Sequence, residues 1–108
     1  MLKWYKYLYL GETVRGKEKK VMRRLEKGKP VPGIWLVTLA SNEKNNLDLL
    51  PADFLVQKAL RNLCPMIVGI GFTRVEAMMI LLRITAEVYE DTGKMNIRLW
   101  LTEKEQRE

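Results

Sequence analysis

The chain has 108 residues, of which 47% are hydrophobic and 30% charged, and its formal net charge is +6. This composition is typical of a soluble globular protein, so a single domain spanning residues 1–108 is predicted. No apolar run reaches the roughly 18–20 residues that cross a bilayer, and no signal-peptide core opens the chain, which predicts a cytoplasmic protein without a membrane span. The lone cysteine, Cys64, excludes an internal disulfide and agrees with a reducing compartment.

The first predicted strand covers residues 4–10, in which side chains alternate between two faces. Tyr5, Tyr7 and Tyr9 fall on one face, and the even-numbered residues fall on the other. Two roles are open for this row of tyrosines. It lines the core, or it stays exposed and stacks nucleic-acid bases.

The basic character of the chain is concentrated in the next element, a helix predicted over residues 15–27. Between Arg15 and Lys29 there are eight basic and two acidic residues, whereas the rest of the chain has eleven of each sign. On a helical wheel the apolar side chains gather on one side and the cations spread over the opposite side. The cations placed to contact phosphates are Lys17, Lys20, Arg23, Arg24 and Lys27. This face is either solvated or binds nucleic acid or another polyanion.

The middle of the chain is predicted to form a hairpin followed by a helix. Residues 34–40 are rich in β-branched and aromatic types, and residues 47–50 supply a short antiparallel partner after a polar loop. Pro51 suits the first turn of a helix whose apolar stripe continues to Leu63. Pro65 disfavours helical geometry at the residue before it and therefore ends this helix.

Residues 66–72 form a continuous apolar run, which is typical of a strand covered on both faces. Thr73 and Glu76 have the spacing of a capping box, so a long helix is predicted to begin at Thr73. Apolar residues occupy most of its circumference as far as Thr92. Gly93 then supplies a left-handed stop.

The last predicted strand covers residues 96–102, where Ile97, Leu99 and Leu101 alternate with other side chains. Residues 103–108 are charged and are predicted to form a frayed tail. The element order is therefore β-α-β-β-α-β-α-β. It predicts an α+β fold in which a mixed sheet carries its helices mainly on one face, compatible with a decorated ferredoxin-like split βαβ arrangement.

The predicted helix over residues 73–92 has more apolar surface than one side of a sheet covers. A chain of this length has little material left to cover the excess, so a homodimer is predicted, with coverage by another helix of the same chain as the alternative. The residues predicted to form the oligomer interface are Met78, Leu81, Ile84 and Val88.

Residue types that carry most catalysis and metal binding are scarce. The chain has no histidine and one cysteine, so neither a histidine base nor a thiolate zinc site can be built. Ser41 is the single serine and has no histidine to activate it. Glu87 and Glu90 share a helix face, but a solvated polar strip is the simpler interpretation. The sequence predicts no catalytic residue, metal, cofactor or small-molecule ligand.

Gly69 and Gly71 lie between a buried strand and a helix, where a dinucleotide phosphate could approach a helix N-terminus. The third glycine of such a motif would fall at Arg74, and no acidic residue ends a following strand at the required spacing. The preferred interpretation is that the two glycines let the helix pack closely on the strand.

Two functions remain after these exclusions, beside a third class, a small enzyme that uses carboxylates, which would need Glu87 or Asp91 to lie in a concave pocket and face another titratable group. The first is a non-catalytic interaction or regulatory module that works as a homodimer. The alternative is binding of nucleic acid or another polyanion through the basic helix, with Tyr5, Tyr7 and Tyr9 stacking bases. Binding of nucleic acid could combine charge with base stacking, or it could rest on charge only. The position of the tyrosines distinguishes these two possibilities, because buried tyrosines could not stack bases.

Overall fold

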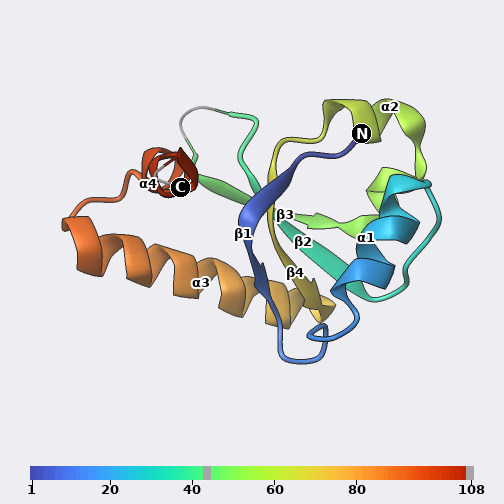
Figure 1. The fold of residues 1–108 in the computed structure, drawn as a ribbon, viewed down its shortest axis with the longest axis horizontal. Helices are drawn as coiled ribbons and strands as arrows, with labels where there is room; N and C mark the ends of the chain where they lie inside the picture. Colours follow the sequence, from blue (N-terminus) through green and yellow to red (C-terminus); the bar gives the residue numbers. More distant parts are fainter. Residues whose placement is uncertain (43–44, 107–108) are drawn as a thin grey trace.

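The computed structural model describes residues 1–42 and 45–106, and these residues contain a mixed sheet of four strands (Figure 1). In spatial order the strands are β1 (Trp4–Leu10), β4 (Ile67–Phe72), β2 (Ile34–Leu39) and β3 (Leu47–Pro51). Strand β1 runs parallel to β4, whereas β2 runs antiparallel to both β4 and β3. The predicted α+β class and mixed sheet are confirmed.

Helices cover both faces of this sheet. The two longest, α3 (Thr73–Thr92) and α4 (Ile97–Gln106), share one face. The other face is covered as well, by α1 (Glu18–Glu26) and η1 (Ala52–Val56), with α2 (Lys58–Leu63) packed beside η1. Both faces are covered because β2 has apolar side chains on each of them. The neighbouring residues Leu36 and Val37 are both fully buried, but they belong to cores on opposite sides of the sheet.

The central strand β4 contains one extra residue, Val68. Val37 of β2 pairs with Gly69 and Thr38 pairs with Ile67, so Val68 falls between these pairs as a bulge. Val68 and the position of Gly69 consequently both face α3. A Cβ atom on Gly69 would lie 2.8 Å from Ile80 Cγ2, so glycine at the bulge leaves the space that Ile80 occupies.

Helix α3 has the predicted bounds. The Glu76 N–H donates to Thr73 Oγ1 over 3.4 Å, as a capping box requires, but the Glu76 carboxylate reaches one residue further back and accepts from the Phe72 N–H at 2.9 Å. The reason is that the Thr73 N–H already donates to the Gly33 carbonyl at 2.7 Å. At the other end Gly93 has φ 69° and supplies the predicted left-handed stop.

The predicted strand over residues 96–102 is wrong, because residues 97–102 belong to helix α4 (Ile97–Gln106). Ile97 and Leu101 are buried whereas Leu99 between them is exposed, which is the i, i+4 pattern of a helix. Asn96 Oδ1 accepts from the Leu99 N–H at 3.2 Å and caps the first turn. Over so short a segment, apolar residues at i and i+4 satisfy both periodicities, and the cap decides between them. The chain therefore ends in two helices instead of a helix and a strand.

Other predicted boundaries also shift. The helix predicted after Pro51 is divided at Gln57, whose backbone is extended, into η1 and α2. The basic helix begins at Glu18 instead of Arg15. Residues 103–106 of the predicted tail continue α4, because Leu101 anchors that helix in the core, while residues 107–108 lie outside the described part of the chain.

Candidate functional site

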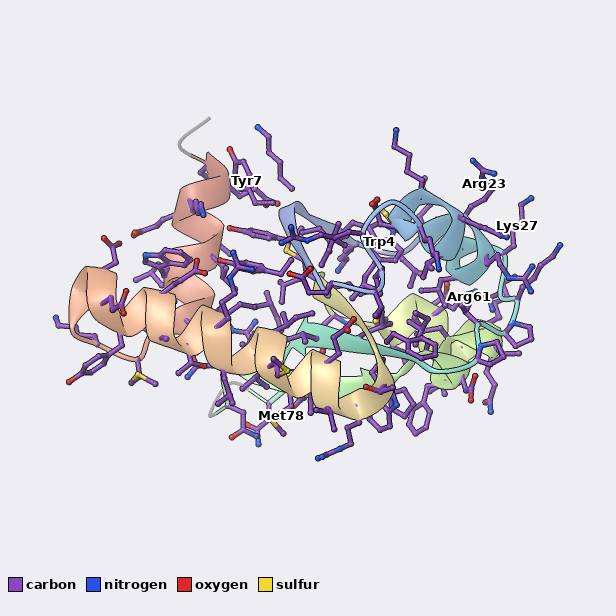
Figure 2. The ribbon with its side chains drawn as sticks, turned by 90° about the horizontal axis from the view of Figure 1, so that it is seen from below. Trp4, Tyr7, Arg23, Lys27, Arg61 and Met78 are labelled. Carbon is purple, nitrogen blue, oxygen red and sulfur yellow. The ribbon has the colours of Figure 1, made fainter. Side chains whose placement is uncertain are left out.

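The cations predicted to contact phosphates lie on α1 or, for Lys17 and Lys27, at its two caps, and the apolar side of this helix holds it on the sheet. Val21 and Leu25 are buried in the core that lies between α1 and the sheet. Lys19, Lys20, Arg23 and Lys27 occupy the opposite side, while Lys17 and Arg24 flank the apolar side. The basic face consists of these six residues. Arg23 and Lys27 point away from the rest of the molecule in Figure 2. Arg24 is half-buried, and its guanidinium donates to the Pro30 carbonyl at 3.1 Å.

The two acidic residues of this segment are directed toward other partners. Glu18 Oε1 accepts from the Gly16 N–H at 2.8 Å. Glu26 Oε1 accepts from the Leu2 N–H at 2.7 Å and from the Trp4 Nε1–H at 3.2 Å. Within residues 1–42 and 45–106, no ion pair joins the basic face to a carboxylate. The segment between Arg15 and Lys29 therefore keeps a net charge of +6 with no described ion pair on its basic face.

The tyrosines proposed to stack bases are not beside the basic face. Tyr5 and Tyr9 are buried under α3 and α4, on the face of the sheet opposite α1. The Tyr5 hydroxyl donates to the Leu101 carbonyl at 3.0 Å, and the Tyr9 hydroxyl donates to Glu87 at 2.9 Å. Tyr7 is half-buried and packs edge-on against Tyr5, with 5.9 Å between ring centroids. Tyr5 and Tyr9 line the core, and the whole row lies on the face of the sheet opposite the basic face. These tyrosines therefore cannot stack bases beside its cations, and charge alone is left for binding there.

The buried Tyr5 has a consequence for stability at high pH. Burial, with a smaller contribution from the charge of Glu105, raises the pKa of Tyr5 to about 12. The unfolded chain loses this proton near about pH 10, so the folded state binds more protons above that pH. The free energy of unfolding is therefore expected to fall as pH rises from about 10 to about 12.

Tyr5→Phe tests this expectation, because the variant lacks the titrating group but keeps the ring. Urea unfolding of the variant, measured between about pH 9 and about pH 11.5, is expected to lose less free energy with rising pH than the parent does. Some dependence remains, since burial and the hydrogen bond to Glu87 also raise the pKa of Tyr9. Identical slopes for variant and parent would contradict the role given to Tyr5.

A hollow of about 470 Å³ lies between α3 and α4. Its lining residues are Glu87, Glu90, Asp91, Trp100 and Lys104. Glu87 accepts from Tyr9 and also pairs with Arg83 Nε at 3.1 Å, while Asp91 accepts from the Trp100 Nε1–H at 2.7 Å. In the part of the chain that the structure describes, no three His, Cys, Asp or Glu side chains are placed to hold a metal ion. The hydrogen bond between Asp91 and Trp100 thus joins α3 to α4, while Glu87 joins α3 to Tyr9 of β1.

Cys64 is the single cysteine of the chain, and its surroundings are those of a core residue. It is buried, its Sγ donates to the neighbouring Pro65 carbonyl at 3.3 Å, and burial raises the pKa of its thiol. A reactive cysteine needs an accessible thiolate. Cys64 is therefore a core residue that closes the end of α2.

Half of the row predicted as an oligomer interface is buried within the chain. Ile84 and Val88 are 0% exposed and pack against the sheet, so their assignment to an interface is wrong. Met78 and Leu81 are half-buried. Ala77 belongs to the same side of α3, and it lies so close to β4 that this side is the one that faces the sheet.

The opposite side of α3 carries the exposed apolar residues. This α3 stripe consists of Val75, Met79, Leu82, Ala86 and Tyr89. All but Ala86 are large side chains, 59% to 69% exposed. The pair of small residues Gly71 and Ala77 is the sequence signal that distinguishes the buried side of α3 from the α3 stripe. A helix approaches a strand most closely where the facing residues of the helix and the strand are both small.

Comparison with protein-family models, with curated proteins and with solved structures gives no match. Among the described helices, none combines the length and the apolar character needed to cross a bilayer. Two surfaces of this chain are candidates for contact with other molecules, the α3 stripe and the basic face of α1.

Proposed function

We propose that the protein is a non-catalytic interaction module that associates with a second copy of itself through the α3 stripe. The observation that supports this proposal is the exposure of five apolar side chains in one row. Single exposed apolar residues are normal on a protein surface, whereas a contiguous row marks a contact surface.

The spacing of the row favours another helix as its contact. Successive members are 4, 3, 4 and 3 residues apart. These are the steps between the a and d positions of a heptad, the repeat by which two helices pack along a common seam. From Val75 to Tyr89 the row covers about 21 Å of helix length. A seam of this length suits a helix of similar size better than an extended peptide or a loop.

Charge favours a second copy of α3 as that helix. In an antiparallel pair with Met79 of one copy beside Leu82 of the other, Glu76 lies within about 3 Å of axial rise of Arg83 of the other copy. The contact occurs twice, once on each side of the twofold axis, and each time it joins opposite charges. A second copy of the chain can therefore cover the apolar α3 stripe and, at the same time, place an opposite charge beside Glu76 and beside Arg83.

Light scattering tests the proposal. At micromolar concentration the parent is expected to have twice the 12.7 kDa mass of one chain. The double variant Met79→Glu/Leu82→Glu would place carboxylates in the seam without a partner, and it is expected to be monomeric. Both side chains are exposed in the single chain, so its circular dichroism is expected to match that of the parent.

Leu99→Glu is the matched control. Leu99 is 50% exposed and lies on α4, outside the α3 stripe, so this variant is expected to remain a dimer. A parent that is monomeric at micromolar concentration would overturn the proposal. A dimer that persists in Met79→Glu/Leu82→Glu would also overturn it, by placing the contact elsewhere.

A further inference from the structure

We infer that the basic face of α1 binds the phosphate backbone of double-stranded nucleic acid, without regard to base sequence. The inference does not depend on self-association, because α1 and α3 lie on opposite faces of the sheet. Two observations support the inference. They are the arrangement of the cations on α1 and the absence of aromatic side chains in residues 15–29.

The basic face repels itself. Lys19 and Arg23, Lys20 and Arg24, and Arg23 and Lys27 are pairs of like charge at i, i+4 spacing. Such pairs destabilise a helix, whereas solvated helices commonly place a carboxylate at this spacing from a cation. A row of phosphates would remove this repulsion and release the counterions that screen it.

The fold also leaves the cations of the basic face free of ion pairs with the acidic residues of their own segment. Glu18 and Glu26 are the acidic residues of the segment, and both accept hydrogen bonds from backbone or indole N–H groups. Among the described residues, neither carboxylate forms an ion pair with a cation of α1. The whole formal excess of positive charge in the chain, +6, equals the excess between residues 15 and 29.

The absence of aromatic residues from the basic segment favours a duplex over a single strand, since the nearby Trp4 is half-buried and its indole N–H donates to Glu26. Single-stranded nucleic acid is held by stacking its bases on aromatic side chains. Residues 15–29 contain no aromatic residue, and Tyr5 and Tyr9 are buried on the other side of the sheet. A duplex presents phosphates at higher density, one charge per about 1.7 Å of axis. Helix α1 has nine residues, a length of about 13 Å, which matches about four phosphates of one strand.

A membrane surface fits α1 less well. Amphipathic helices bind membranes by inserting their apolar side between the lipids. The apolar side of α1, with Val21 and Leu25, is already buried in the core of the protein. Only its cationic side faces outward, so insertion would require α1 to leave the sheet.

Fluorescence anisotropy with a labelled 20-base-pair DNA of random sequence tests the inference. Four phosphate contacts predict that affinity falls roughly 100-fold between about 50 mM and about 200 mM salt. Arg23→Glu/Lys27→Glu is expected to weaken binding at least tenfold at the lower salt concentration and to reduce the salt slope by about two. Arg74→Glu/Lys94→Glu makes the same change in net charge at exposed sites away from α1, and its affinity is expected to stay within about threefold of the parent.

Four results would overturn the inference. The first is that the parent shows no salt-dependent binding to the duplex. The second is that a single strand of equal length binds more tightly than the duplex. The third is that vesicles of phosphatidylserine and phosphatidylcholine bind the protein while the duplex does not. The fourth is that the control variant weakens as much as Arg23→Glu/Lys27→Glu, because net charge and not the basic face would then account for binding.

Discussion

Ile84→Ala is expected to reduce the free energy of unfolding by about 2–5 kcal/mol. The Ile84 side chain is 0% exposed and lies between α3 and the sheet, in the core that also contains Val37 and Val68. Truncation removes buried methyl and methylene groups and leaves a cavity that the long, well-anchored helix cannot close. Urea unfolding followed by circular dichroism measures the loss.

Leu82→Ala is the matched control for Ile84→Ala, two residues away on the same helix. Leu82 is 59% exposed, so its truncation is expected to change the free energy of unfolding by less than about 0.5 kcal/mol. Both changes are made in a Met79→Glu background, so that self-association does not contribute. Equal losses at the two positions would mean that α3 does not present Ile84 to the sheet.

Gly71→Ala is expected to be as damaging as the loss of Ile84, by about 3 kcal/mol or more, because it forces atoms into occupied space. A Cβ atom at this position would lie 2.7 Å from Ala77 N and 3.0 Å from Ala77 Cα. These are backbone atoms in the second turn of α3, so relief requires the whole helix to move away from β4. The packing role predicted for this glycine from the sequence is thereby confirmed.

Gly93→Ala separates this steric effect from the effect of backbone conformation. Gly93 has φ 69° but nothing lies within 4 Å of a Cβ atom built there. Its replacement is expected to cost only about 1 kcal/mol, for the left-handed conformation. If thermal unfolding ranks Gly93→Ala as the more harmful change, the close contact between Gly71 and Ala77 is not a constraint on the fold.

Local signals in the sequence were sufficient for much of the fold. The bounds of α3 follow from Thr73, Glu76 and Gly93, which act on their own neighbours. The alternation of β1 also follows from sequence, because a strand has a period of two wherever it lies. Such features need no knowledge of the strand order.

The errors in placing the tyrosines and the exposed row of α3 have a common origin in long-range contacts. The sequence shows that Tyr5 and Tyr9 share a face, but only the order β1-β4-β2-β3 and the positions of the helices put α3 over that face and α1 over the other. The same limitation explains why the sequence predicts the oligomer interface on the side of α3 that faces the sheet. Both rows are apolar, and the contact of Ala77 with Gly71 decides which one meets the sheet.

The placement of α1 and α3 on opposite sides of one sheet limits how the molecule could use them together. Two chains joined along their α3 helices would direct their cationic helices outward, to the two far sides of the assembly. Such an assembly could not close on one duplex as a clamp does. It would hold two segments apart at a fixed separation, and would thus cross-link nucleic acid instead of encircling it.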